Sequence, residues 1–331
     1  LQADIYVSAP GLVSSRPEGT LDPALARRLT ATEGLAGAST YREAEVTEEE
    51  GTLRVVALDL HPRGEAAFDF KEGGGDQGFG EFREGEGVFL SEALAYRKGL
   101  SVGDSLSVPS DEGPVDLRIS GVFFDYGSDR GVAMMARTTY ERYWTDRGVT
   151  SLGLFLPPGQ PVDRMVEKLQ GQVGGDQLVQ IRSNRALKAA SLEVFDRTFA
   201  ITGVLRALAF IVAFIGVLSA LMALQLERGR ELGVLRANGL TPGQIWKLVT
   251  VQTGLMGLVA GVLAVPAGLI LAVVMIFVVN KRSFGWTLKL ELGPEILIQA
   301  VLLAVVGAVL AGIYPSWRMS RTSPALALRE E

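Results

Sequence analysis

The 331 residues are enough for two ordinary domains, and the sequence divides near residue 198 into an acidic part and a basic, very apolar part. Residues 1–198 contain 21 Lys/Arg and 31 Asp/Glu, whereas residues 199–331 contain 11 and 6. The acidity of the first part argues against nucleic-acid binding, and the absence of cysteine, with His61 as the single histidine, excludes disulfides and metal centres built from several such side chains.

Residues 1–190 alternate short strand-like runs with helix-like runs, which predicts an α+β domain. The predicted strands are 4–8, 53–60, 115–122, 132–136, 152–156 and 179–182, and the predicted helices are 23–30, 91–98, 138–144 and 162–169. The glycine-rich run 73–80 is interpreted as a flexible loop. It lacks the Lys-Ser/Thr ending of a phosphate-binding loop, so we expect no nucleotide to bind there.

No pattern in residues 1–190 indicates a catalytic centre. A histidine-based triad would need His61, but the run His61-Pro62-Arg63-Gly64 is typical of a turn. The acidic cluster at 48–50 is interpreted as solvated surface rather than a calcium site. We therefore predict a protein that is not an enzyme and that has no catalytic residues, no bound cofactor and no metal site.

Three later segments are long and apolar enough to cross a bilayer, which needs about 20 residues. They run from about 199 to 224, from 248 to 279 and from 296 to 314. Leu192, Phe195 and Phe199 fall at helical spacing before the first of them, which predicts that the first span extends outward as a stalk helix.

The second span covers about 32 residues, or ~48 Å of helix, which exceeds the ~30 Å of a hydrocarbon core. Pro266 in its middle is interpreted as a kink that accommodates this mismatch, with a functional hinge as the alternative. Gly254, Gly257 and Gly261 share one face of the span, which predicts close packing against another helix.

Basic residues between the first two spans and after the third predict that both places are cytoplasmic. They are Arg228, Arg230, Arg236, Lys247, Arg318, Arg321 and Arg329. Because spans alternate in direction, residues 1–198 and 280–295 are then extracytoplasmic.

The stretch 225–247 between the first two spans is predicted to hold a short amphipathic helix. Asn238-Gly239 is a helix-stop signal, and Thr241-Pro242 is a helix-start signal. On its residues alone, the short helix either lies on the membrane surface or is offered to the groove of a cytosolic partner.

The run Arg-Glu-Leu-Gly-Val-Leu-Arg-Ala-Asn-Gly at 230–239 resembles the cytoplasmic link of FtsX-like ABC transporter permeases, the group that includes the MacB-type and lipoprotein-releasing exporters. The ending 314–331, with its Pro, basic stretch and Pro-x-x-Ala-Leu-Arg, is similar to the ending of the same family. The runs 121–131 and 280–286 resemble the large permeases that carry two such modules in one chain, and 87–106 is similar to the core of MacB-like outer domains.

This resemblance implies a MacB-like extracytoplasmic domain at 1–190 and an FtsX-like transmembrane domain at 191–331. It implies a permease subunit in the bacterial cytoplasmic (inner) membrane, with ATP bound by a separate ATPase subunit, and export or extraction of a lipid-like, lipoprotein or hydrophobic substrate. The residues that it implies for coupling to the ATPase are Glu227, Arg228, Arg230, Glu231, Leu232, Gly233, Leu235, Arg236, Gly239 and Leu240.

Members of this family contain a span before the outer domain, whereas this sequence opens at Leu1 in a strand-like run. We therefore expect the chain to be a piece of a longer protein, with further transmembrane helices supplied by the preceding region or by a second permease. Lipid and an extracytoplasmic protein are the other expected partners.

Two other functions are weighed against the transporter. One is a membrane signalling or scaffold protein whose outer domain regulates an extracytoplasmic partner without moving cargo. The other is an ion-coupled carrier, which requires charged residues deep in its spans; Arg206 is the candidate, and its position near a helix end favours snorkelling to the headgroups.

Overall fold

The computed structural model describes residues 2–10, 19–48, 51–128, 130–173, 177–227, 231, 234–235 and 238–321. The chain divides into two compact units. The sheet unit comprises Leu1–Glu193 and Phe277–Leu288, and the helical unit comprises Val194–Ile276 and Lys289–Glu331. Each unit is described by itself.

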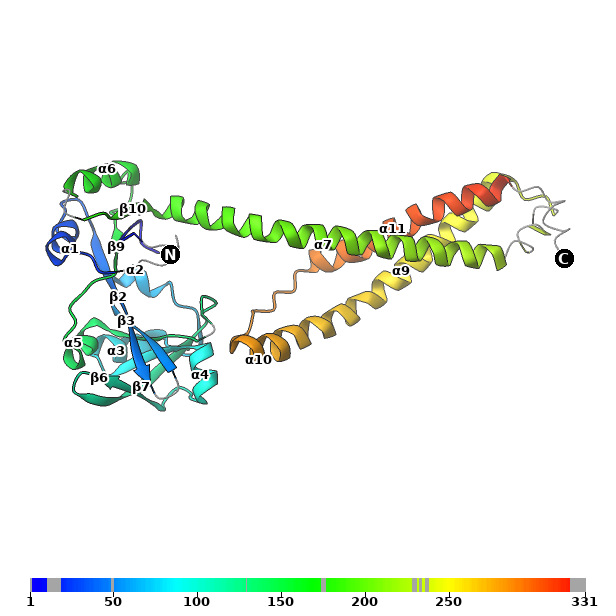
Figure 1. Cartoon of the computed structure of the whole chain (residues 1–331). Coiled ribbons are helices and arrows are strands. Elements are labelled where there is room, and N and C mark those ends of the chain that lie inside the picture. The colour runs from blue at the N-terminus through cyan, green and yellow to red at the C-terminus, as the bar shows by residue number, and fades with distance from the viewer. Residues whose placement is uncertain are drawn as a thin grey trace. The chain divides into compact units, whose positions relative to one another are not determined.

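In the described part of the sheet unit, ten strands form one mixed sheet (Figure 1). Its order is β10-β1-β9-β2-β3-β8-β5-β7-β4, and β6 pairs with β7. The β3–β8 and β5–β7 pairs are parallel, and the other pairs are antiparallel. The strands are β1 (Ile5–Ser8), β2 (Gly37–Glu48), β3 (Gly51–Asp59), β4 (Phe70–Gly73), β5 (Gly87–Ser91), β6 (Ser105–Ser110), β7 (Gly113–Phe123), β8 (Ala133–Ala136), β9 (Ser151–Phe155) and β10 (Gln180–Ser183).

The middle of the sheet is buried on both faces, because the strands there are continuous apolar runs rather than alternating ones. In β3, Val55 and Ala57 face one buried cluster, whereas Val56 and Leu58 face another. A third cluster joins β1, β9 and β10 to two of the helices. The helices of this unit are α1 (Pro23–Thr30), α2 (Pro62–Glu65), α3 (Gly75–Glu84), α4 (Glu92–Lys98), α5 (Arg137–Tyr143) and α6 (Val162–Gln172).

The prediction of a flexible loop at 73–80 is wrong, because α3 begins at Gly75. Phe79 and Phe82 stand three residues apart and are buried against the sheet, so the burial of two rings outweighs the low helix propensity of glycine. At Gly78 an added Cβ would lie 3.0 Å from the carbonyl oxygen of Ser120. The glycine therefore lets this helix approach the sheet closely.

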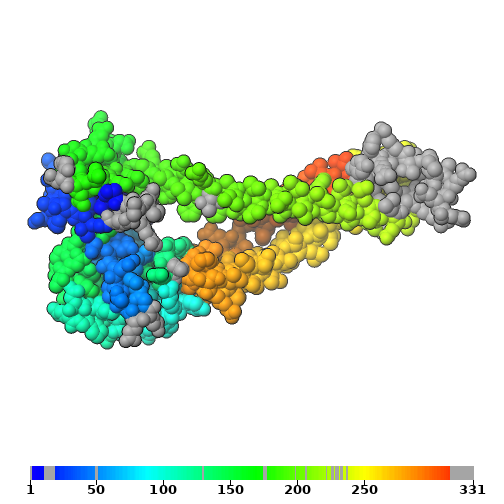
Figure 2. All heavy atoms as spheres, viewed as in Figure 1, coloured from blue at the N-terminus to red at the C-terminus, as the bar shows by residue number. Residues whose placement is uncertain are grey.

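The long helices are α7 (Asn184–Glu227), α9 (Pro242–Val274) and α11 (Pro294–Arg321). Among the described residues, three helical stretches are long and apolar enough to cross a membrane: Asn184–Leu224, Pro242–Phe284 and Pro294–Ile313. α7 is one unbroken helix of 44 residues, so residues 184–198 and the first apolar span form a single helix, drawn in Figure 2 as a long run of mostly green spheres.

The glycine face of the second span packs against the third span within the helical unit. An added Cβ at Gly257 would lie 2.6 Å from the Cβ of Ala308, and one at Gly261 would lie 3.1 Å from the Cβ of Ala304. These residues let α9 and α11 approach closely, as predicted. The α-helix continues through Pro266 to Val274, and a π-helical turn follows at Met275–Asn280, before α10 (Lys281–Phe284).

Candidate functional site

The stretch between α7 and α9 contains the predicted helix stop. The Asn238 N–H donates to the Val234 carbonyl oxygen (3.0 Å), and the Leu240 N–H reaches back to the Leu235 carbonyl oxygen (3.2 Å). Gly239 between them has φ +98°, a backbone conformation that glycine adopts without steric cost. The Leu240-to-Leu235 bond and the positive φ of Gly239 are features of a Schellman C-cap, so a helical turn ends at Gly239, as predicted.

The next helix begins at once, through a capping box. The Thr241 hydroxyl accepts a hydrogen bond from the Gln244 N–H (3.4 Å), and the Gln244 side chain accepts one from the Thr241 N–H (2.9 Å). Pro242 at the first helical position has no N–H to leave unsatisfied. Local hydrogen bonds therefore lie on both sides of the short connection at 239–241, which is called the corner below.

The ten residues predicted to couple to an ATPase fall partly within the described chain. Glu227 ends α7 and is exposed, Glu231 is exposed, and Leu235 and Leu240 are half-buried. Arg228, Arg230, Leu232, Gly233 and Arg236 lie outside the described residues, as does the side chain of Arg206. The coupling role itself stays a prediction, and so does the hinge at Pro266.

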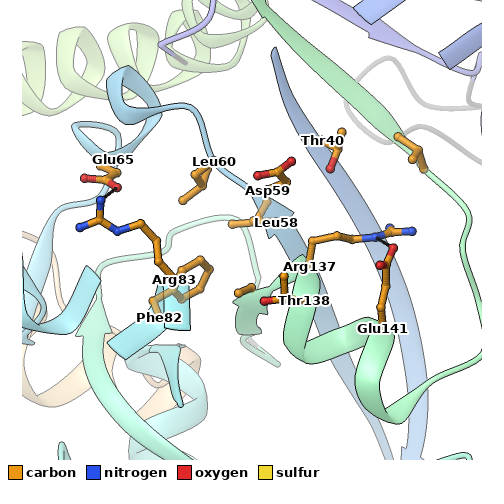
Figure 3. A pocket seen from close by; sticks show the side chains of 12 residues that line it. Thr40, Leu58, Asp59, Leu60, Glu65, Phe82, Arg83, Arg137, Thr138 and Glu141 are labelled. Atoms are coloured by element: carbon orange, nitrogen blue, oxygen red, sulfur yellow. Dashed lines mark hydrogen bonds and ion pairs between the residues drawn. The ribbon is translucent and has the colours of Figure 1, made fainter. Parts of the chain in front are cut away.

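A cavity of about 530 Å³ opens in the sheet unit between β3, α3 and α5 (Figure 3). Leu58, Leu60 and Phe82 form much of its apolar wall. Its two arginines are each paired with a carboxylate: Arg83 with Glu65 (3.7 Å) and Arg137 with Glu141 (2.7 Å). The described lining residues include neither histidine nor lysine, so both of the cations that line the cavity are arginines already paired with carboxylates.

His61 stabilises the local fold through a helix cap and a ring contact. It caps α2, with its Nδ1 accepting a hydrogen bond from the Arg63 N–H (3.3 Å), and its ring stacks on Phe155 with centroids 4.4 Å apart. Among the described residues, no group of three or more His, Asp or Glu side chains is arranged to hold a metal ion.

A second hollow, of about 570 Å³, is lined in part by Arg42, Tyr140 and Asp146. Burial opposes ionisation of Asp146, but hydrogen bonds from the Gly148 N–H (2.8 Å) and from Arg42 (2.6 Å) outweigh it and lower the pKa of this carboxyl. The ion pair fastens β2 to the loop after α5.

The lowered pKa of Asp146 predicts a loss of stability in acid. A carboxyl with a folded-state pKa below its unfolded value stabilises the fold above the unfolded pKa, and this contribution disappears as the pH falls through the folded pKa, below about pH 4. Replacing Arg42 by Met should lower stability at pH 7 and flatten its dependence on pH below 4. Urea unfolding followed by hydrogen exchange in β2 measures both effects; identical pH dependence in the two proteins would contradict the assignment.

Residues 203–324 match the family model described as FtsX-like permease C-terminal, and this range contains the capped corner at 239–241. Residues 203–324 are an FtsX-like permease module. The resemblance predicted from 230–239 is thereby confirmed, and the corner lies between two helices that are long and apolar enough to cross a membrane.

Relatives of the FtsX-like module extend the match to the sheet unit. The whole chain is 40% identical to an uncharacterized ABC transporter permease protein of Mycobacterium tuberculosis and covers 39% of that protein. It is 25% identical, over 74% of its length, to the lipoprotein-releasing system transmembrane protein LolC of Xylella fastidiosa, of which it covers 65%. The solved periplasmic region of MacB from Actinobacillus actinomycetemcomitans matches 57% of this chain and 92% of that one, with 12% identity and a TM-score of 0.41.

Proposed function

We propose that this chain is part of the transmembrane subunit of an ABC transporter and that its residues 227–240 dock on a separate ATPase subunit. The observation that carries the proposal is the capped corner at Gly239–Thr241 inside the FtsX-like module. One helix stops at Gly239 and the next starts at Thr241, and local hydrogen bonds at the stop and at the start hold this connection together when an ATPase moves against it.

The helices on either side of residues 227–240 provide a route by which movement of an ATPase reaches the rest of the chain. One side is α7, which ends at Glu227 and runs back without a break to Asn184, about 66 Å of helix. The other side is α9, which starts at Pro242. Movement of an ATPase against 227–240 therefore acts on the ends of both helices. At its start α7 is held to the sheet unit by the Asn184 N–H, which donates to the Asp4 carbonyl oxygen (2.9 Å).

In this proposal the corner and the chain end face the cytoplasm, and the sheet unit lies on the other side of a bacterial inner membrane. The basic residues near the corner and after the third span support that orientation. The cargo class is lipid-like, lipoprotein or hydrophobic. The described spans keep many apolar side chains exposed, among them Ile201 (68%) and Ile270 (67%), which lipid and further transmembrane helices would cover.

The decisive experiment copurifies the full-length protein with its candidate ATPase and compares variants within the proposed docking residues 227–240. Leu235→Asp removes an apolar contact and Glu231→Arg reverses an exposed charge. Each is expected to weaken ATPase association, Leu235→Asp by about 2 kcal/mol or ~30-fold. Leu178→Asp is the matched control, because Leu178 belongs to the sheet unit and is 82% exposed; it should leave association unchanged.

Two outcomes would move the proposal aside. In one, the ATPase fails to copurify with the wild type, and in the other it binds and hydrolyses ATP fully with both Leu235→Asp and Glu231→Arg. In either case the stretch 227–240 is a membrane-surface element. The signalling or scaffold function would then be the better account of the chain.

A further inference from the structure

Glu92 is a buried carboxylate that the proposed function does not use. It is the first residue of α4 and is only 2% exposed. The run around it, Gly87–Ala95, is apolar apart from Ser91 and Glu92 itself. Ser91 fixes its position, because the Ser91 hydroxyl oxygen caps α4 and also accepts a hydrogen bond from the Val132 N–H (2.8 Å). A buried carboxylate is costly unless several donors surround it.

The donors come from two distant parts of the chain. Lys71 in β4 places its Nζ 2.6 Å from Oε1 of Glu92. The Thr287 backbone N–H donates to Oε2 (2.8 Å), and the Thr287 hydroxyl lies 2.9 Å from Oε1 and 3.1 Å from Oε2. Thr287 is itself 7% exposed. The carboxylate thus holds a residue 195 positions further along the chain.

The residues before Thr287 also fit the sheet unit closely. Gly285 has φ +78°, and an added Cβ there would lie 3.2 Å from the Cα of Ala93. The Trp286 ring meets the Tyr126 ring edge to face at 5.2 Å, and Lys281 of α10 lies 5.0 Å from the centre of the Tyr96 ring of α4. Asn280 fastens the turn internally by donating to the Trp286 carbonyl oxygen (2.8 Å). Figure 1 draws α10 beside α4, in line with these contacts.

We propose that the segment Lys281–Thr287 is docked into the Glu92 site as a permanent joint and that this joint connects the second and third spans directly to the sheet unit. Phe277–Leu288 packs as part of that unit, although it comprises the end of the apolar stretch Pro242–Phe284 and the four residues that follow it. The chain therefore passes between the units at 193–194, 276–277 and 288–289. The joint adds a connection that does not run through α7, and the docking itself stands whether or not an ATPase binds the corner.

Hydrogen exchange of the full-length protein in lipid nanodiscs tests the joint. In the wild type, the Thr287 amide should exchange slowly for a residue outside any helix or strand, because it donates to a buried carboxylate. Glu92→Leu should speed its exchange roughly 10- to 100-fold. Glu86→Leu is the matched control, since Glu86 is exposed and its side chain has no part in the joint; it should leave the Thr287 amide unchanged.

Since Glu92→Leu alters a core position, a second variant acts from the other side. Thr287→Val keeps the shape and the backbone N–H but removes the hydroxyl, and it leaves α4 intact. It should speed exchange across 285–288 while the amides of β5 stay protected. The joint is wrong if these amides exchange at the rate of an open loop in the wild type, or if neither variant changes that rate.

Discussion

Replacing Phe89 by alanine is expected to lower the free energy of unfolding of the sheet unit by about 3–5 kcal/mol. Phe89 is fully buried in β5 and lies between four other phenylalanine rings. Its ring centre is 5.7 Å from Phe68, 4.9 Å from Phe70, 5.2 Å from Phe79 and 4.7 Å from Phe82. Truncation leaves a cavity that rigid neighbours on both sides of the ring cannot fill.

The change is measured as the shift in denaturant midpoint, followed by hydrogen exchange of the β5 amides in the full-length protein. Phe89→Leu should cost less than Phe89→Ala, because more of the volume is kept. Leu178→Ala changes a side chain that is 82% exposed, so it should lower the free energy of unfolding by about 0.5 kcal/mol at most. Equal effects at the two positions would mean that the phenylalanine cluster is not the core of this unit.

The same cluster shows where sequence patterns gave the wrong answer. Five glycines in residues 73–80 favour a loop, but Phe79 and Phe82 are spaced to bury together, and the helix C-cap at Gly85 ends the segment. Phe79, Phe82 and Gly85 carry the opposite signal, because two buried rings and a helix-ending glycine favour a helix despite the low helix propensity of the other glycines. Tertiary packing decided the outcome.

Strand β2 escaped prediction for a different reason. Its sequence, Gly37–Glu48, is rich in Glu, Thr and Ser and shows no apolar alternation, and its residues are half-buried or exposed rather than buried. The strand exists because it pairs with β3 along most of its length and with β9 at its start. Its charges are met by partners such as Asp146 for Arg42 and Arg54 for Glu43. Arg54 lies in the next strand of the chain, whereas Asp146 lies 104 positions from Arg42, beyond the reach of a local sequence pattern.

The three spans, the stalk and the corner at 239–241 were predictable, because the length of an apolar run, a Gly stop and a Thr-Pro start are local properties. The Glu92 joint was not, since it joins residues 195 positions apart. One sign of it is present in the sequence: Glu92 stands in an otherwise apolar run, where a carboxylate requires donors from elsewhere.

Replacing Gly257 by alanine is expected to destabilise the helical unit by about 1–3 kcal/mol. The added Cβ would lie 2.6 Å from the Cβ of Ala308 and 3.1 Å from the Ala304 carbonyl oxygen. Neither atom is the end of a flexible side chain, so α9 and α11 must separate. Separation loses the close contact along the rest of the glycine face, including the approach of Gly261 to Ala304.

Gly268→Ala in the same helix is the matched control, because an added Cβ there meets nothing within 4 Å. With no clash, the better helix propensity of alanine should make it neutral or slightly stabilising. The two substitutions are chemically identical, so opposite signs in the thermal unfolding of the detergent-solubilised protein would isolate the effect of packing.

A double substitution carries the argument to the specific contact. If the destabilisation by Gly257→Ala arises from the Ala308 methyl group, then adding Ala308→Gly should recover part of the lost stability. The coupling free energy between the two substitutions should then be about 0.5 kcal/mol or more. Recovery should be incomplete, since the Ala304 carbonyl oxygen and the Cα of Val305 remain 3.1 Å from the new Cβ. Strict additivity would mean that Gly257 faces lipid or another subunit rather than α11. The contact between α9 and α11 at Gly257 would then be wrong.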